Sequence, residues 1–413
     1  MPVGAESVAG QVDTPVLIAG AGPVGLLVAL QLARLGVDST VLESEPGLTI
    51  DLRAGTFHPP TLEMLEDVGV TDEMIARGIK VPYWQSWDLE AGMVAEWDLS
   101  LLRNDTRYPF RLHLEQHRLT PILLDRLKQF PGVKVLFDHR FVSMKQTDHH
   151  VEVEAATSSG AVRFKALWLV GADGGRSQVR KSAGIEFAGY TWPERYSVIS
   201  TRHDFALHGF RENAYISDPV QWCAVFKMPD DGPPGLWRMT LPVGNDVTDA
   251  EALAGPYAQR CIRRLTGHAD SVDYPLVHQS IYSVHQRVAV SMRTGRVLLA
   301  GDAAHVNNPL GGFGLNSGIH DAMNLGEKLA SVVRGDAPEA LLDRYHRQRH
   351  TVNVEYVQTL SVKNKQNLEV KDPAERAQRI AMLRDTCKDP VKAREYLLNS
   401  SMINSIRRVA TID

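Results

Sequence analysis

The chain has 413 residues, 44% of them hydrophobic, and a formal net charge of −4. That amount of apolar material can fill a large core, and the length predicts two closely joined domains. The charges are mixed in sign, which argues against a nucleic-acid-binding surface. No uninterrupted apolar stretch is long enough to span a bilayer. Residues 1–12 lack the basic region and apolar centre of a secretory signal, so we expect them to form a loose tail.

The three cysteines, Cys223, Cys261 and Cys387, are scattered along the chain. Their spacing fits neither a metal site nor a disulfide framework, and it favours a reducing compartment. We therefore predict a cytoplasmic protein without a metal centre.

The first predicted elements are a strand, a glycine-rich turn and a helix. Residues 14–19 are apolar enough for a buried strand, and the chain then reads GAGPVG from Gly20 to Gly25. From residue 23 to residue 35 leucines recur at helical spacing, and Gly36 provides a stop. Strand, glycine turn and helix in this order are the context in which a GxGxxG motif binds a dinucleotide.

Each glycine of this motif has a different physical task. Gly20 permits the tight turn, Gly22 lets the backbone approach a pyrophosphate, and Gly25 lets the helix pack closely on the strand. Unpaired N–H groups at the helix N-terminus attract the phosphates. A second strand, residues 37–42, ends at Glu43, an acid about 20 residues beyond the glycines that can bind ribose hydroxyls. The motif does not distinguish FAD from NAD, and a plain strand-to-helix turn with chance glycines is the alternative.

Two further glycine-containing turns follow predicted strands. Residues 166–170 are strand-like and lead into DGGRSQVR, which runs from Asp173 to Arg180 and continues as a short helix. Residues 295–300 form another strand, followed by GDAAHVNNPLGGFGLN from Gly301 to Asn316 and then a long helix. Glycines at this density indicate backbone pressed against a flat ligand. Asp302, just beyond the strand, is placed to bind sugar hydroxyls, although an acid that caps the next element is the simpler interpretation.

The three motifs together resemble the fingerprints of class A flavoprotein monooxygenases, the para-hydroxybenzoate hydroxylase-like family. The resemblance covers roughly residues 13–345 and implies one noncovalently bound FAD. Arg53 resembles the family's loop residue beside the flavin, Gln116 the helix-starting residue that touches the phosphate and ribityl chain, and Asp302 the ribityl ligand. The full set of expected FAD contacts is Gly20, Gly22, Gly25, Glu43, Arg53, Gln116, Asp302 and the backbone of Gly314, Leu315 and Asn316. Asp173 and Arg180 would serve the pyridine-nucleotide groove or the local fold.

The resemblance implies an α/β fold: a Rossmann-like FAD-binding domain with an interleaved antiparallel-sheet substrate domain and a helical C-terminus. Alternating stretches at 220–226 and 236–241 predict strands of a sheet that roofs the substrate over the flavin. The expected boundaries are 13–80, 105–185 and 287–340 for the FAD-binding domain, 81–104 and 186–286 for the sheet domain, and 341–413 for the helical region.

Substrate contacts are harder to assign than cofactor contacts. By resemblance, the backbone carbonyl of Pro309 accepts the substrate hydroxyl, and loop rigidity is the alternative interpretation. His58 and His113 lie near the expected site, although such residues are more often packed loop residues. The candidates in the roof sheet are Arg211, which could bind a substrate carboxylate, and Tyr215, Trp222, Trp237 and Arg238, although such residues are more often core or solvated rim than specific substrate contacts.

The activity implied is hydroxylation of an electron-rich aromatic ring, phenolic or similar, with NAD(P)H and O2 through a flavin C4a-hydroperoxide. Flavin supplies the chemistry, and the protein supplies position and exclusion of water. The alternatives are epoxidation or polyketide oxidation on the same scaffold, a nicotinamide dehydrogenase without flavin, and a non-catalytic nucleotide binder. Glu43 and Glu45 without an adjacent basic cluster slightly favour NADH. The expected partners are a small aromatic substrate, O2 and NAD(P)H, with no nucleic acid and no membrane span, and a homodimer is left open.

Overall fold

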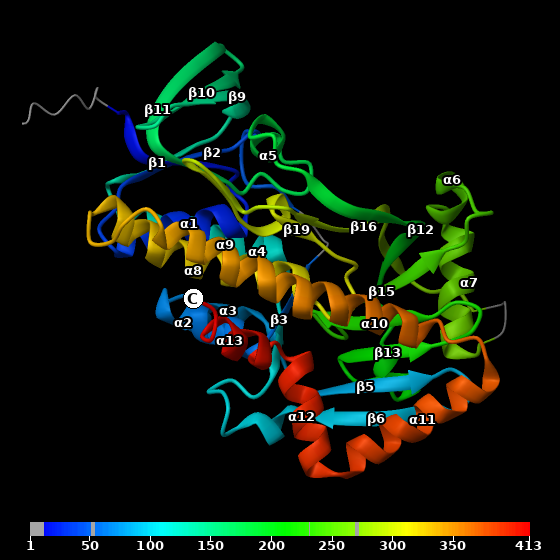
Figure 1. The fold of residues 1–413 in the computed structure, drawn as a ribbon. Coiled ribbons are helices and arrows are strands. Elements are labelled where there is room, and N and C mark those ends of the chain that lie inside the picture. The colour runs from blue at the N-terminus through cyan, green and yellow to red at the C-terminus, as the bar shows by residue number, and fades with distance from the viewer. Residues whose placement is uncertain (1–11, 51–53, 231, 269–271) are drawn as a thin grey trace, which may run out of the picture.

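The computed structural model of the protein describes residues 12–50, 54–230, 232–268 and 272–413. Two large sheets lie at opposite ends of the molecule, and long helices run between them (Figure 1). The predicted fold class, a Rossmann-like α/β unit with an interleaved, mostly antiparallel sheet and a helical C-terminus, is confirmed. None of the helices in the described ranges is long and apolar enough to cross a membrane.

The first sheet holds the three glycine motifs. Its central strands β18, β11, β1, β2 and β8 pair in parallel in that order, and β10 and β9 extend β11 as an antiparallel flap. The strands are β1 (Thr14–Ala19), β2 (Ser39–Leu42), β8 (Val133–Leu136), β9 (Arg140–Gln146), β10 (Val151–Thr157), β11 (Gly160–Gly171), β17 (Arg293–Thr294) and β18 (Val297–Leu299).

Helices pack against this parallel sheet because its central strands are apolar on both faces. β1, for example, buries all but one of its six residues. The covering helices include α1 (Pro23–Arg34), α4 (Gln116–Leu127) and α8 (Phe313–Val333), and α1 packs against both of the others. These elements begin and end within a few residues of the sequence-based expectation. The short helix of the second motif, α5 (Gln178–Ser182), follows β11.

The second sheet has the order β19-β16-β12-β15-β14-β13-β5-β6, and its pairs are antiparallel except β13 with β5. One face packs on α6 (Asp249–Ala252) and α7 (Gly255–Thr266) in a separate apolar core, and the other faces the glycine loop. The strands are β5 (Tyr83–Asp88), β6 (Gly92–Asp98), β12 (Phe187–Thr201), β13 (Asn213–Ser217), β14 (Cys223–Met228), β15 (Leu236–Val243), β16 (Leu276–Ala289) and β19 (His305–Val306).

A third, small sheet has three strands. Its order is β3-β7-β4, with β7 in the centre and antiparallel to both neighbours. The elements are β3 (Thr56–Phe57), β4 (Ile79–Val81) and β7 (Arg111–His113), with α2 (Pro59–Asp67) and α3 (Thr71–Arg77) between the first two strands.

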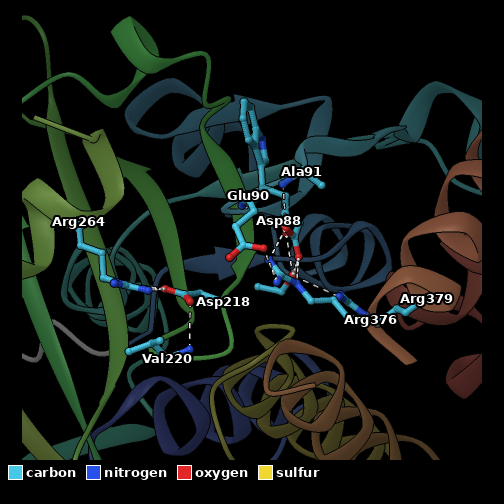
Figure 2. A network of polar contacts seen from close by, with 10 residues as sticks. Asp88, Glu90, Ala91, Asp218, Val220, Arg264, Arg376 and Arg379 are labelled. Atoms are coloured by element: carbon cyan, nitrogen blue, oxygen red, sulfur yellow. Dashed lines mark hydrogen bonds and ion pairs between the residues drawn. The ribbon is translucent and has the colours of Figure 1, made fainter. Parts of the chain in front are cut away.

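The C-terminal region is helical and touches both halves of the molecule (Figure 1). Its helices are α9 (Leu341–Val352), a π-helical segment (Asn353–Gln358), α10 (Thr359–Leu368), α11 (Pro373–Lys388), α12 (Pro390–Ser400) and α13 (Ile403–Val409). Figure 2 shows how α11 is fastened to the second sheet: Arg376 donates to both carboxylate oxygens of Asp88, at 2.6 and 2.5 Å, and to Glu90 at 2.8 Å. Arg379, one turn further on, lies at the same junction.

Candidate flavin and substrate site

The glycines of the first motif divide into two that the fold itself requires and one that it does not. A Cβ atom on Gly20, whose φ is +103°, would overlap the carbonyl oxygen of Ala172, and one on Gly25 would overlap that of Gly20. A Cβ on Gly22 would meet no protein atom within 4 Å. Packing therefore explains Gly20 and Gly25, whereas Gly22 is explained by a ligand that approaches the backbone.

This turn presents a helix N-terminus and an acid. Gly22 is the N-cap of α1 and offers no side-chain cap, so the first N–H groups of the helix are left to a ligand. Glu43, just beyond β2, accepts hydrogen bonds from the N–H of Ala21 at 2.7 Å and from the N–H of Glu45 at 3.0 Å. Glu43 thus fixes the glycine turn and remains at the edge where a ribose would lie.

The second motif fastens the first sheet to the third motif. Asp173 accepts hydrogen bonds from Ser177 Oγ at 2.5 Å and from the N–H of Gln178 at 2.7 Å, which caps α5. Arg180 donates to the carbonyl of Ala303 at 2.8 Å and to that of Gly175 at 3.0 Å. Of the two roles left open for Asp173 and Arg180, these contacts support the local fold.

The third motif forms a tight loop held from several sides. Asn316 Nδ2 donates to the carbonyls of Gly312 at 2.6 Å and Thr56 at 2.8 Å, and its Oδ1 accepts the N–H of His58 at 2.9 Å. His58 Nε2 donates to the carbonyl of Gly311 at 2.8 Å. The Asn316 side chain is therefore committed to the loop, and only its backbone can face a flavin. Gly312 N–H donates to the carbonyl of Pro309 at 3.0 Å, which leaves that oxygen one further lone pair.

The remaining expected FAD contacts lie around this loop. Helix α8 starts after Gly312 without a side-chain cap, so the N–H groups of Gly314 and Leu315 lack intrahelical partners. Asp302 is exposed in the short turn after β18. Gln116 is the first residue of α4, and its side-chain amide bonds no other described residue. Arg53 lies outside the described residues.

These features fit FAD. The space over Gly22, the two uncapped helix N-termini and the acids near the strand ends match a pyrophosphate between two sugars. The side-chain oxygen of Asn307 is buried without a hydrogen-bond partner and lies 3.4 Å from where a Cβ on Gly314 would stand. Such an unpaired buried oxygen is unusual in a folded protein and is accounted for by a bound polar group.

On the substrate side, the glycine loop packs against aromatic residues of the second sheet. Leu310 belongs to one apolar cluster with Trp222, Tyr196 and the partly buried Tyr215 and Phe226. Trp222 was expected on a strand, but it lies just before β14. Its Nε1 donates to Glu369 at 2.9 Å. Trp237 points to the opposite face, into the core under α7, because side chains alternate along β15.

The two arginine candidates have different surroundings. Arg238 is buried on the site-facing side of β15 and forms an ion pair with Glu115, with Nη2 and Oε1 2.5 Å apart. Arg211 has a side chain that is 48% exposed and is paired with Glu96 at 3.0 Å. The structure therefore brings Tyr215, Trp222 and Arg238 toward the glycine loop and leaves Arg211 at the surface.

One strand of the site was missed by the sequence analysis. Residues 111–115 read Arg-Leu-His-Leu-Glu, and this alternation places the leucines in the first core and the three polar side chains toward the second sheet. All three are at most 3% exposed. The signal that could have revealed this strand was the alternation of polar and apolar residues directly before Gln116, the first residue of α4. Their partners are the Trp84 ring, 4.9 Å from the Arg111 guanidinium, the Lys227 carbonyl, 2.9 Å from His113 Nδ1, and Arg238, paired with Glu115.

The buried histidines of the site are neutral. Burial and the nearby Arg111 charge hold the pKa of His58 well below its usual value, and burial lowers the pKa of His113 to about 4. Because Nε2 of His58 and Nδ1 of His113 donate to carbonyls, the other ring nitrogen of each is a bare acceptor, and neither finds a protein partner.

A second buried network of hydrogen bonds, which the sequence did not reveal, joins α8 and α9 to the loop of the third motif. Asp321 of α8 accepts hydrogen bonds from His305 at 2.6 Å, Arg349 at 2.6 Å and the N–H of Gly301 at 3.0 Å. Burial alone would raise the pKa of Asp321, but the adjacent His305 and Arg349 lower it. Within the described part of the chain, no group of three or more His, Cys, Asp or Glu could hold a metal ion.

Comparison with known proteins gives consistent matches. The family described as FAD binding domain matches residues 13–359. The chain is 35% identical over 392 residues to para-nitrophenol 4-monooxygenase of Pseudomonas sp. (strain WBC-3), covering 95% of this chain and 96% of that protein. It is 36% identical over 362 residues to 6-hydroxy-3-succinoylpyridine 3-monooxygenase HspB of Pseudomonas putida (strain DSM 28022 / S16), covering 87% and 90%.

Solved structures show the same relationship. The crystal structure of p-nitrophenol 4-monooxygenase PnpA from Pseudomonas putida DLL-E4 superposes with a TM-score of 0.89 at 34% identity and covers 96% of this chain and 98% of that one. Aklavinone-11 hydroxylase, solved with FAD and aklavinone, has a TM-score of 0.75 at 29% identity over 87% of this chain and 70% of that one.

The chain belongs to the family of FAD-binding aromatic monooxygenases. It is an FAD-dependent aromatic hydroxylase that uses O2. The choice between FAD and NAD, open from the first motif, is thus decided for FAD, and a dehydrogenase without flavin is not supported.

Proposed function

We propose that the protein hydroxylates a small monocyclic phenol, taking two electrons from NADH and one oxygen atom from O2. The balanced reaction converts the arene C–H, O2, NADH and a proton into the arene C–OH, NAD⁺ and water. The observation that carries the proposal is the packing of the Pro309–Gly312 loop against an aromatic face of the second sheet, with Arg111 and two neutral histidines buried beside it.

The relatives that this chain matches over almost their whole length support a small substrate. The two nitrophenol hydroxylases match it over 96% and 98% of their own lengths, at 35% and 34% identity, and are named for a monocyclic phenol. A monocyclic phenol is therefore favoured over a polyketide, and epoxidation is the remaining alternative.

Bound flavin would supply the reduction of O2 and the transfer of one of its oxygen atoms, and the chain's own residues position the ring. The free lone pair of the Pro309 carbonyl accepts the substrate hydroxyl, which raises electron density on the ring carbon next to it. Tyr215, Trp222 and Arg238 close the sheet side of the site and exclude water. The FAD contacts are those of the first and third motifs, and the FAD is held without a covalent bond.

NADH is retained as the proposed donor because no basic cluster that would bind a 2′-phosphate accompanies Glu43 and Glu45. Because that turn is assigned to FAD, the choice is tested by kinetics. A higher kcat/KM for NADPH than for NADH would contradict this choice. We also propose a cytoplasmic location. The proposed domain boundaries are 13–80, 105–185 and 287–340 for the FAD-binding domain and 81–104 and 186–286 for the sheet domain.

The test is a substrate panel with the purified holoprotein. Phenol, 4-nitrophenol, 4-hydroxybenzoate, a polycyclic phenol and an alkene are each incubated with NADH and air, and products are identified by mass spectrometry. We expect hydroxylated product from at least one monocyclic phenol and none from the alkene. Product only from the polycyclic phenol or the alkene would overturn the proposal.

A further inference from the structure

Among the described residues, Arg111 is a buried cation without a partner anion. The residue is 2% exposed; its Nη2 donates to the carbonyl of Ser400 at the end of α12, at a long 3.4 Å, and its guanidinium also interacts with the neutral phenol of Tyr215. Its Nε and Nη1 atoms have no hydrogen-bond partner. None of the ion pairs found among the described residues includes Arg111. Buried charges in proteins are almost always paired, and buried N–H groups almost always bonded.

The described groups around Arg111 come from five elements, and none of them is a carboxylate. The Trp84 ring of β5 lies under the guanidinium at 4.9 Å, and the phenols of Tyr215 in β13 and Tyr396 in α12 lie nearby. His58 at the start of α2 and His113 in β7 also interact with Arg111, and both are neutral. Burial accordingly lowers the pKa of Arg111, but an arginine stays protonated at neutral pH.

The position of Arg111 connects it with the glycine loop. Tyr215 interacts with Arg111 and with the backbone of Gly311, and His58 binds the carbonyl of Gly311. Arg111 and its unpaired N–H groups therefore lie on the substrate side of the small sheet, close to the loop that contains Pro309. The opposite face of that sheet, with Leu112, belongs to the apolar core.

We propose that Arg111 binds an anionic oxygen of the aromatic substrate, either the phenolate oxygen or an oxygen of an acidic or nitro substituent. This inference rests on the proposed function for the aromatic nature of the ligand. A planar guanidinium offers parallel N–H donors that suit such oxygens, and charge-assisted bonds are strong where the one described carboxylate on this polar face, Glu115, is already paired with Arg238. The bare acceptor nitrogens of His58 and His113 disfavour a second anion but accept an O–H or N–H from the ligand.

The test measures binding to the oxidised holoprotein without NADH, so that no turnover is needed. Dissociation constants for 4-nitrophenol, phenol, benzoate and benzamide are determined by calorimetry in the wild type, in Arg111→Met and in Arg211→Met as the matched control. We expect Arg111→Met to weaken binding of at least one anionic ligand by roughly 10- to 100-fold, as a charged hydrogen bond predicts. Arg211→Met should bind as the wild type does, because Arg211 is an exposed residue paired with Glu96.

The ligands distinguish the two sources of the anionic oxygen. If Arg111 holds the phenolate, the absorption of bound 4-nitrophenol shows a lowered pKa in the wild type that returns toward the free value in Arg111→Met, and benzoate binding is unaffected. If Arg111 holds the substituent, benzoate binds more tightly than the isosteric benzamide, and only that difference disappears in the variant. In either case phenol hydroxylation could still fail, which would refute the proposed function and leave this binding role standing.

Equal affinities of Arg111→Met and the wild type for every ligand, with FAD content and melting temperature retained, would overturn the proposal. If the Arg111→Met variant loses FAD, the proposal is tested with the wild-type protein alone, by the two measurements that follow. Benzoate binding no more tightly than benzamide, together with an unshifted pKa of bound 4-nitrophenol, would then refute an anion-binding role for Arg111.

Discussion

Glu115 and Arg238 form a buried ion pair that joins the two halves of the site. Arg238 Nη2 lies 2.5 Å from Glu115 Oε1, and each side chain is only 4% exposed. Glu115 directly precedes α4, whose first residue is the expected FAD contact Gln116, whereas Arg238 lies in β15 of the second sheet. The pair therefore couples the position of the cofactor helix to the position of the substrate sheet.

Removing one partner of this pair should destabilise the protein strongly. We expect Arg238→Met to lower the free energy of unfolding by about 3 kcal/mol, because Glu115 would remain buried with only its longer contacts, 3.6 Å to His117 and 3.8 Å to Arg118. The double variant with Glu115→Gln should recover part of that loss. Denaturant unfolding of the four proteins gives the coupling, and additive effects of the two substitutions would show that the ion pair does not matter.

Gly22→Val should abolish FAD binding without unfolding the chain. A side chain at Gly22 meets no protein atom within 4 Å, so the fold should tolerate it, but the side chain would occupy the path of the pyrophosphate. The loss in affinity should be on the order of 100-fold or more, because charged hydrogen bonds to phosphate contribute roughly 1.5–3 kcal/mol each. Flavin content after gel filtration measures it. Gly255→Val, at another helix start with open space, is the control that should stay yellow.

Gly312→Val should uncouple oxygen transfer from NADH oxidation. Gly312 has a φ of +70°, which strains any L side chain, and a Cβ there would already be in contact with Thr56 at 3.4 Å and with His58 Nε2 at 3.6 Å. Because the two Cγ atoms of valine extend beyond the Cβ, we expect the Pro309–Gly312 loop to shift. Misplacement on the ångström scale can reduce product formation by up to roughly 100-fold. We expect more hydrogen peroxide per NADH with FAD still bound.

The matched control for this loop is Gly335→Val. Gly335 has a similar φ of +79° but open space around it, at the far end of α8. It should lose stability from the same backbone strain and keep its coupling. Equal coupling in the Gly312 variant and the wild type would remove the loop and Pro309 from the oxygen-transfer site.

The buried histidines should make the protein less stable in mild acid. In the folded state burial lowers the pKa of His113 from 6.5 to about 4 and that of His320 to about 3, so the unfolded chain binds more protons below pH 6.5. The contribution of the two neutral histidines to the free energy of unfolding is fully present above pH 6.5. It falls as the pH drops toward 4, by about 1.4 kcal/mol per pH unit for each histidine. His113→Asn, which retains a donor for the Lys227 carbonyl, should flatten the dependence of unfolding free energy on pH. An unchanged slope would refute the assignment of His113.

The cofactor side of the site could be predicted from the sequence because its determinants are local. Gly20, Gly22 and Gly25 act within one strand-turn-helix unit, and the same unit gives β1 its predicted bounds. The loop from Gly301 to Asn316 is likewise contiguous. Family resemblance then linked three such units that the chain brings together only in the folded state.

The substrate side could not be predicted in the same way, because its determinants come from distant strands. Whether an arginine is buried or exposed depends on which face of its strand packs against other elements of the fold. Arg211 and Arg238 therefore look alike in the sequence, but Arg211 is exposed and Arg238 is buried in the structure. The alternation of residues 111–115 was visible, but only the pairing of β7 with β3 and β4 shows that its polar face is buried. The ends of α10 and α12 complete the site from the C-terminal region, where the sequence predicted helices and no contacts.

The hydroxylase activity is tested most directly by following ¹⁸O2 in a reaction of the FAD-loaded protein with NADH and an accepted monocyclic phenol. We expect one ¹⁸O atom per molecule of hydroxylated product, formed in proportion to the NADH consumed. Product without label, or NADH oxidation that yields only hydrogen peroxide with every phenol tested, would contradict it.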